Sequence, residues 1–262
     1  MKKIKTIIHK EWSEVFKNKM VLFTIIFMPL LFTALPLIML YVTRDSGVSD
    51  ITSEMPAQFL QLCPEGLSGG QCFQVYIASQ FMLLFMLMPL IIPVNIAAYS
   101  VVGEKTTHSL EPLLATPITT IELLTGKNLA AVIPAVIAAL VGFMLYALGA
   151  WIIVRDPQVM KVLLDSMWLI AVVIVGPLMA VLSVNFSLIV SSRVNDPRVA
   201  EQLSVVVIVP VLLLFFGQLS GLIFINHQIV LAIALGVLLV DVLMLYLSVR
   251  LFQRETILTR WK

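Results

Sequence analysis

The chain has 262 residues, of which 60% are hydrophobic and only 12% are charged, and its mean hydropathy is +1.03. Soluble domains are roughly 45–50% apolar and about 25% charged, so this composition excludes an ordinary soluble protein and indicates an integral membrane protein. The formal net charge of +2 is small. We attribute it to the distribution of lysine and arginine about a membrane, and it gives no reason to expect a nucleic-acid partner.

Residues 1–19 form a basic segment ahead of the first apolar run. Large apolar side chains recur there at helical spacing, with lysines on the other side: Ile4, Ile7, Ile8, Trp12, Val15 and Phe16. This pattern predicts an amphipathic helix lying in the inner headgroup layer, and the alternative is a disordered basic tail. A secretory signal is not expected, because the apolar run that follows is longer than the 7–15 residues or so of a signal peptide and no A-x-A cleavage site follows it.

Six apolar runs are long enough to cross a hydrocarbon core, which takes about 20 residues of helix. They cover residues 20–42, 75–102, 129–154, 167–190, 203–225 and 229–249. The predicted fold is therefore an all-α membrane protein with six transmembrane helices in one domain over residues 1–262. Loops are expected at 43–74, 103–127, 155–166 and 191–202, with a tight turn at 226–228 and a basic tail at 250–262. Seven prolines inside the spans should bend or loosen these helices: Pro29, Pro36, Pro89, Pro93, Pro134, Pro177 and Pro210.

Lysine and arginine predict the orientation of the spans, because short cytoplasmic loops are enriched in both. With the N-terminus inside, fourteen of the 17 lysine and arginine residues fall on the cytoplasmic side, and only Arg44, Arg155 and Lys161 fall outside. Both termini and the 103–127 loop are therefore expected in the cytoplasm.

The 103–127 loop, GEKTTHSLEPLLATPITTIELLTGK, is a polar break that carries helix signals. Ser109 is a good N-cap for a short helix, and Pro117 disfavours helix at the residue before it and so ends the segment. The short helix presents an apolar face at i, i+3 and i+4, made by Leu110, Leu113 and Leu114. We expect this helix to lie across the mouth of the bundle.

A second helix should begin in the same loop, because Thr119 and Glu122 have the spacing of a capping box. The helix-compatible run from residue 121 to 154 has a length of about 51 Å, well beyond a hydrocarbon core of roughly 30 Å. Its first two turns, with Glu122, Lys127 and Asn128, are therefore predicted to project into the cytoplasm. This would place the short helix clear of the lipid, where a soluble partner could reach it.

Residues 67–71 spell LSGGQ, the signature motif of ABC ATPase domains. That motif contributes to an ATP site only opposite a phosphate loop of the form GxxxxGK[ST], which this sequence lacks. The charge bias also puts the motif outside, so we interpret it as a glycine-rich turn. Because HExxH and GxSxG are missing as well, we expect no catalytic site.

Cys63 and Cys72 are the only cysteines and both fall in the loop predicted to face the outside. An intraloop disulfide is the expected arrangement, with two free thiols as the alternative. No metal site is expected, because His9, His108 and His227 lie in different segments.

Asp241 is the only formally charged residue in the six predicted spans. A carboxylate within a membrane is costly, so it is a candidate for binding a cation or relaying a proton, although it could equally pair with a polar side chain on a neighbouring helix. Four other polar residues are candidates for a substrate pathway: Asn95, Asn185, Gln218 and Ser220. Interhelical hydrogen bonding is the alternative role for each of them.

The 103–127 loop contains the pattern GEK-x4-LE-x-LLATP-x4-EL-x2-GK. In this pattern, and in the basic helix before six spans, the chain resembles the ABC-2 type permease family over nearly its whole length. One position departs, because His108-Ser109 stands where many relatives have Gly-Thr, which keeps the cap but makes the turn before it less flexible.

The resemblance implies a permease subunit of an ATP-driven exporter in a prokaryotic plasma membrane. Two copies of the chain, or one copy and a related permease, would pair with two separate ABC ATPase subunits, which would hold ATP and Mg; the chain itself would bind no cofactor. The 104–117 loop would be the coupling element, and the N-terminal helix would be a second contact. The coupling residues implied are Glu104, Lys105, Ser109, Leu110, Glu111, Leu113 and Leu114. Residues 217–221 would form the broken hairpin that the family carries between its last two spans.

Two other functions remain open from the residues alone. One is a secondary transporter that uses Asp241 with an ion gradient. The other is a membrane anchor or assembly subunit without transport. Transport that survives ATP depletion would favour the first, and normal partner recruitment without substrate-stimulated ATPase activity would favour the second.

Overall fold

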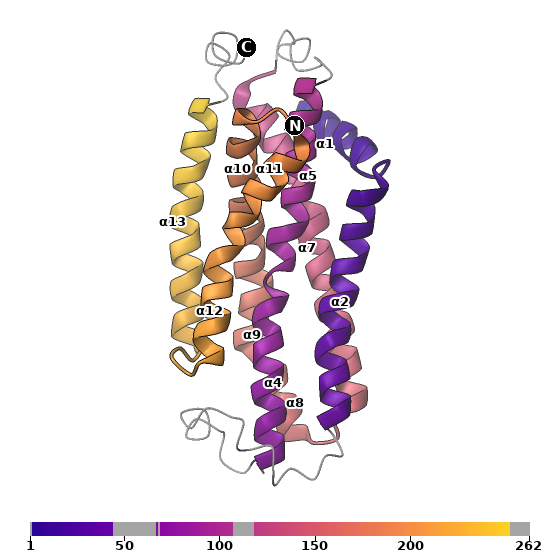
Figure 1. Ribbon diagram of the computed structural model, residues 1–262, viewed down its shortest axis with the longest axis vertical. Coiled ribbons are helices and arrows are strands. Elements are labelled where there is room, and N and C mark those ends of the chain that lie inside the picture. Colours follow the sequence, from indigo (N-terminus) through magenta and orange to yellow (C-terminus); the bar gives the residue numbers. More distant parts are fainter. Residues whose placement is uncertain (1, 44–66, 68, 107–117, 252–262) are drawn as a thin grey trace.

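The computed structural model describes residues 2–43, 67, 69–106 and 118–251, and every regular element in these ranges is a helix. Six helical segments are long and apolar enough to cross a membrane, which confirms the predicted all-α membrane fold. Figure 1 shows an elongated bundle in which α1 and the last turn of α13 lie at one end, whereas α8 and the turn between α12 and α13 lie toward the other. We refer to these as the α1 end and the α8 end.

The first two helices are α1, Lys2–Val15, and α2, Lys19–Thr43. A short turn separates them, and α1 lies at a steep angle to the bundle while α2 runs along it (Figure 1). A helix is therefore present where the sequence predicts one, and its location in a headgroup layer stays a prediction.

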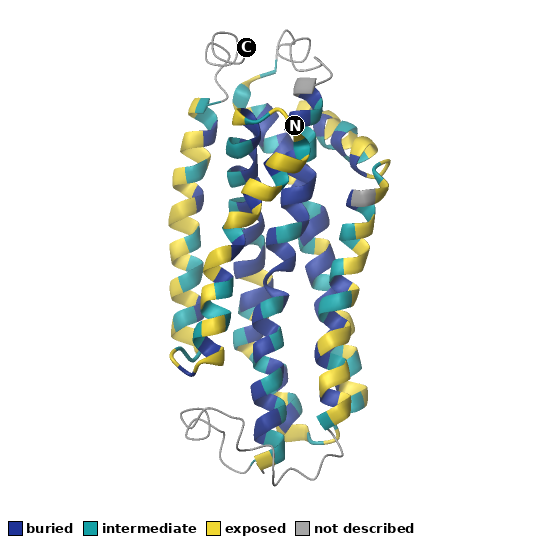
Figure 2. Cartoon of the chain, in the orientation of Figure 1, coloured by how far each residue is buried: buried dark blue, intermediate teal, exposed yellow. Residues whose placement is uncertain are grey.

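The second span consists of two stacked helices, α4, Gly69–Phe85, and α5, Met88–Thr106. At the junction the Met86 and Leu87 amides donate to carbonyls three residues back, at 3.1 and 2.9 Å, in place of the α-helical pattern. Pro89 explains the break, since it has no N–H to donate to the carbonyl four residues earlier and its ring crowds that carbonyl. This span is buried along most of its length and forms the centre of the bundle (Figure 2).

The third span is α7, Thr120–Ile153, with 34 residues. The predicted capping box is present: the Glu122 amide donates to Thr119 Oγ1 at 3.2 Å, and the Thr119 amide donates to Glu122 Oε2 at 2.9 Å. The predicted start and length of this helix are confirmed. Lys127 and Asn128 are nonetheless buried and do not face solvent, because the packing against α1 and the rest of the bundle covers this part of α7.

The fourth span is preceded by a helix in the segment that we predicted as the 155–166 loop. This helix is α8, Pro157–Leu163, and Asp156 caps it by accepting a hydrogen bond from the Gln158 amide at 2.7 Å. Asp followed by Pro is a strong helix start, so the loop prediction was wrong for most of this segment. The span itself comprises α9, Ser166–Ile170, a π-helical stretch η2, Ala171–Val175, and α10, Gly176–Arg193.

The fifth span also begins earlier than predicted. It comprises α11, Pro197–Ser204, a 3₁₀ stretch η3, Val205–Ile208, and α12, Val209–Leu219. The predicted 191–202 loop shrinks to residues 194–196, because Asp196 caps α11 and accepts from the Arg198 amide at 2.7 Å. The same Asp-Pro signal explains this correction.

The turn into the last helix, α13, His227–Leu251, starts at residue 220 and is longer than the predicted 226–228 turn. Gly221 has a φ of 73°, which only glycine adopts without strain. The Leu222 and Ile223 amides donate to the Gly217 carbonyl at 2.9 and 3.1 Å and so close the end of α12. The fifth span therefore ends at Leu219, not at 225.

The outward faces of α2, α12 and α13 are apolar and exposed (Figure 2). On α13 the exposed side chains include Leu231, Leu235, Leu239 and Val242. Such faces are unfavourable in water and suit the hydrocarbon core of a bilayer. The chain is therefore a multi-pass membrane protein.

Candidate functional site

α1 packs closely against the first turns of α7. One stripe of α1, at a spacing of four residues, is buried: Ile7, Glu11 and Val15. Where Ile7 meets α7 the facing residue is Gly126, and a Cβ there would lie 2.7 Å from Ile7 Cγ2. A side chain at this position would collide with Ile7, so glycine permits the close approach of the two helices.

A buried group of alternating charges joins α1 to α5 and α7. Lys127 Nζ lies 2.8 Å from Glu11 Oε1 and 2.9 Å from Glu104 Oε2, and it donates to Ser100 Oγ at 2.7 Å. Lys10 donates to the other oxygen of Glu104. The side chains of Lys127, Glu11 and Glu104 are 2%, 3% and 4% exposed. We call Lys10, Glu11, Glu104 and Lys127 the ion-pair cluster.

The cluster is electrically balanced, with two ammonium groups and two carboxylates. An unpaired charge at such depth would cost several kcal/mol of desolvation, so the three buried members, Glu11, Glu104 and Lys127, require their partners in place, whereas Lys10 is 36% exposed. Because the four residues come from α1, α5 and α7, moving α7 away would leave Glu11 and Glu104 without Lys127, and moving α1 away would leave Lys127 with Glu104 alone.

The pKa of Glu11 shows which interaction dominates. Burial alone would raise the pKa of this carboxyl, yet the nearby Lys127 ammonium and the hydrogen bonds from Lys127 and Ser100 hold it below its usual range. Glu11 is therefore ionised at neutral pH, as the ion pairs require.

The cluster lies beside both borders of residues 107–117. α5 ends at Thr106, two residues after Glu104, and α7 begins at Thr120, seven residues before Lys127. Lys3 on α1 also lies 3.6 Å from Glu122 Oε2, in the capping box of α7. The two helices that border this segment are thus both tied to α1.

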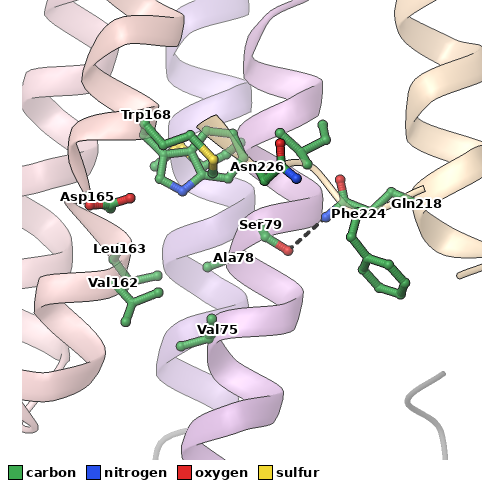
Figure 3. Close-up of a pocket in the computed structure, with 13 residues that line it drawn as sticks. Val75, Ala78, Ser79, Val162, Leu163, Asp165, Trp168, Gln218, Phe224 and Asn226 are labelled. Atoms are coloured by element: carbon green, nitrogen blue, oxygen red, sulfur yellow. Dashed lines mark hydrogen bonds between the residues drawn. The ribbon is translucent and has the colours of Figure 1, made fainter. Parts of the chain in front are cut away.

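A cavity of about 310 Å³ lies toward the α8 end of the bundle, between α4, the α8–α9 segment and the α12–α13 turn (Figure 3). Gln218 lines it and donates through Nε2 to Ser79 Oγ at 3.1 Å. Asp165 and Trp168 line its other side.

Residues 5–248 match the family described as ABC-2 family transporter protein. The chain belongs to this family. It is thus the membrane permease component of an ABC transporter, which is a transport role. No curated protein matches the chain at a significant level.

The structure of this ABC-2 protein tests the predicted coupling residues only in part. Glu104 lies in α5 with its carboxylate buried in the ion-pair cluster, so that group is engaged within the chain. Lys105 also lies in α5, and its side chain is not described. The others fall within residues 107–117, outside the described part, namely Ser109, Leu110, Glu111, Leu113 and Leu114. Their role stays a prediction.

The predicted pathway residues do not form one constellation. The Asn95 side-chain amide donates to the Ile91 carbonyl of its own helix at 3.3 Å, and Asn185 accepts from Asn128 Nδ2 on α7 at 3.2 Å. Asn185 therefore joins two helices, and a pathway role for either residue stays a prediction. Ser220 donates to the Gly217 carbonyl at 3.0 Å at the end of α12. Of the five predicted pathway residues, only Gln218 lines the 310 Å³ cavity.

Asp241 is the fifth of these residues. It is buried in α13, at 3% exposure, and neither of its carboxylate oxygens has a hydrogen-bond partner within the described ranges. It does not line the cavity.

The LSGGQ sequence has a structural role at its described positions. Gly69, Gly70 and Gln71 form the first residues of α4, and the side-chain Nε2 of Gln71 donates to the Asp156 carboxylate. Cys72 follows in α4 and is buried, whereas Cys63 lies outside the described residues. The disulfide therefore stays a prediction.

The ion-pair cluster was not predicted from the sequence, although one signal for it exists. Glu11 falls on the apolar stripe of α1, between Ile7 and Val15, where a solvated carboxylate would not be placed. A carboxylate on a buried face requires a cationic partner, and Lys127 is a basic residue near the start of a long apolar helix.

Proposed function

We propose that this chain is the permease subunit of an ATP-driven exporter. Two copies, or one copy and a related permease, would assemble with two separate ATPase subunits that hold ATP and Mg. The α1 end would face the cytoplasm of a prokaryotic cell, because fourteen of the 17 lysine and arginine residues fall on that side in the predicted topology.

The observation that carries this proposal is the ion-pair cluster. Residues 107–117, the proposed docking segment, connect α5 to α7, and the cluster joins those two helices to α1. A partner that pushes on this segment or on α1 would therefore move three elements together. Moving α7 away from the other two would cost about 3–5 kcal/mol, because it would separate the buried Lys127 from Glu11 and Glu104.

The test is to disrupt the docking segment. Leu113→Asp and Glu111→Lys should leave the protein inserted in the membrane but reduce co-purification of the ATPase or its stimulation by substrate. Lys161→Glu is the matched control, because Lys161 is a charged residue exposed on α8 at the opposite end and does not line the cavity. Unchanged ATPase recovery and unchanged transport in both loop variants would contradict the assignment.

Asp241 supports a second candidate, transport driven by an ion gradient. Its burial without a described hydrogen-bond partner is what a cation- or proton-binding carboxylate in a membrane would show. Transport that survives ATP depletion and is abolished by Asp241→Asn would favour this function over ATP-driven export.

A further inference from the structure

The turn between α1 and α2 carries two lysines that no described residue neutralises. Lys17 lies in this turn and Lys19 is the first residue of α2, and both side chains are exposed. Neither forms an ion pair within the described ranges, whereas Lys10 on α1 pairs with Glu104. We call residues 16–19 the α1–α2 corner. Two positive charges are therefore available there for a negatively charged group from outside the chain.

Backbone hydrogen bonds fix the shape of the α1–α2 corner. The Lys17 amide donates to the Glu14 carbonyl at 3.2 Å, and the Asn18 amide donates to the Val15 carbonyl at 3.1 Å. The Leu22 amide then donates to the Asn18 carbonyl at 3.0 Å and continues the chain into α2. The backbone positions from which the two lysines extend are thus defined by the fold.

An exposed line of side chains runs from Lys19 along α2 (Figure 2). Lys19, Phe23 and Phe27 are spaced by four residues, so they lie on one face of the helix over about 12 Å of its length. The two phenylalanine rings are stacked with their centroids 4.8 Å apart, and their side chains are 60% and 42% exposed. This face therefore presents a charge followed by an apolar surface, which is the order of groups in a phospholipid.

Aromatic side chains also mark the α1 side of the corner. Phe16 is 50% exposed and makes an edge contact with Trp12, with the ring centroids 6.5 Å apart. The Trp12 indole donates to the Ala130 carbonyl of α7 at 3.0 Å. Such rings are typical of the membrane–water interface, where nearby lysines lay their stems along apolar surface and extend their ammonium groups to the headgroups.

The composition of this face of α2 suits lipid better than a second helix. Interfaces between transmembrane helices are enriched in small residues, which let two backbones approach closely. The exposed side chains between residues 21 and 30 are instead all bulky, namely Phe23, Ile26, Phe27 and Leu30. An acyl chain can follow such a surface, because no partner backbone has to come near it.

We propose that the α1–α2 corner binds an anionic phospholipid. Its phosphate would lie between Lys17 and Lys19, and one acyl chain would lie along Phe23 and Phe27. None of these residues lines the 310 Å³ cavity, so this lipid would occupy a surface site apart from it. The proposal goes beyond the export function and rests on it only for assigning the lipid to the cytoplasmic leaflet.

Native mass spectrometry of the full chain in detergent micelles, titrated with lipid, measures this binding. The two probes are phosphatidylglycerol, which is anionic, and phosphatidylcholine, which has no net charge, with the same palmitoyl and oleoyl chains. The wild-type chain should bind phosphatidylglycerol roughly thirtyfold more tightly, because each of the two lysines should contribute about a fivefold gain.

Charge variants assign that preference to the corner. The double variant Lys17→Gln, Lys19→Gln should lose the preference while its binding of phosphatidylcholine stays unchanged, and Lys17→Arg, Lys19→Arg should keep it. The matched control is Arg155→Gln, Lys161→Gln, which removes two exposed basic residues without described ion pairs at the α8 end. This control should leave the preference unchanged.

The aromatic variant Phe23→Ala, Phe27→Ala should weaken binding of both lipids and keep the ratio of their affinities. Equal binding of the two lipids by the wild-type chain would overturn the proposal. An equal loss of preference in the corner variant and in the α8-end control would also overturn it, because the attraction would then be a general one. Lipid-free dimers that the aromatic variant dissociates would overturn it as well, by showing that this face contacts a second copy. The loop variants test the export function separately, since binding of lipid requires no ATPase.

Discussion

Lys127→Met is the most direct perturbation of the ion-pair cluster. Methionine keeps the apolar stem and removes the ammonium group, so Glu11 and Glu104 lose contacts of 2.8 and 2.9 Å. Of the two ammonium groups in the cluster, that of Lys10 would then remain, which donates to Glu104 and lies 3.9 Å from Glu11. The cluster would change from neutral to a net charge of −1 in a site that is almost closed to water.

The size of the expected effect of Lys127→Met follows from the burial of Glu11 and Glu104. Removing one partner of a buried, hydrogen-bonded pair costs about 3–5 kcal/mol, and here Glu11 would keep only the more distant Lys10 ammonium as a charged partner within the cluster. Since each 1.4 kcal/mol is a factor of about ten, the population in which α1 is detached from α5 and α7 should rise by roughly two to three orders of magnitude.

Hydrogen–deuterium exchange of the α1 peptide, in protein held in lipid nanodiscs, measures that population. Lys127→Met should speed exchange in α1 strongly, and adding Glu104→Gln, which restores neutrality with Lys10 and Glu11, should recover part of the protection. Lys3→Met is the control, because the Lys3–Glu122 pair is solvent-exposed and screened. If Lys127→Met and Lys3→Met gave the same exchange rates, the cluster could not be what holds α1 in place.

Three further predictions concern the contact between α1 and α7, the turn before α13, and the pH dependence of the ion-pair cluster. Gly126→Ala places a Cβ 2.7 Å from Ile7 Cγ2 and should speed exchange in α1, with recovery in the Gly126→Ala, Ile7→Ala double variant; no recovery would mean that the contact is not the cause. Gly221→Ala should lower the apparent melting temperature, because a left-handed conformation costs an alanine roughly 1–2 kcal/mol, whereas Gly236→Ala, with open space around it, should not. Because the pKa of Glu11 is lowered in the folded protein, its carboxylate stabilises α1 fully at pH values above 4.5, the ordinary pKa of a glutamate, and this stabilisation is lost as the pH falls through the lower pKa of the folded state. The protection of α1 from exchange, relative to the protection in Glu11→Gln, should therefore decline as the pH is lowered below 4.5. A ratio of the two that does not change with pH would contradict the assignment.

The six spans were predictable because hydropathy and helix length are local properties. The start of α7 was equally local, since the capping box needs only Thr119 and Glu122. The errors arose where local signals were given too little weight: Asp156-Pro157 and Asp196-Pro197 start helices inside predicted loops. The fifth span was predicted to continue to residue 225 because the sequence stays apolar to that point. The helix ends at Leu219, where the backbone enters a turn.

The candidate sites were less accessible to prediction, because both depend on which helices are neighbours. Lys127 was expected to face the cytoplasm, and its burial depends on α1 folding back over α7, a contact between residues more than 100 positions apart. Gln218 and Asn185 are both polar residues within apolar helices, and the sequence around them does not indicate which one pairs with another helix and which one lines a cavity. Only the structure shows that Asn185 pairs with Asn128 while Gln218 faces a cavity.

The two sites share one span, the second, and the break between α4 and α5 at residues 86–87 lies between them on it. The cluster uses α5 and the start of α7, whereas the cavity uses α4, the α8–α9 segment and the end of α12. The second span is broken at residues 86–87, the fourth contains a π-helical stretch and the fifth a 3₁₀ stretch, while α2, α7 and α13 are uninterrupted. The three spans that contribute walls to the cavity are therefore those whose α-helical hydrogen bonding is interrupted, whereas α2 and α7 have internal prolines, Pro29, Pro36 and Pro134, as their bending points. Irregularities of the first kind are common at functional hinges.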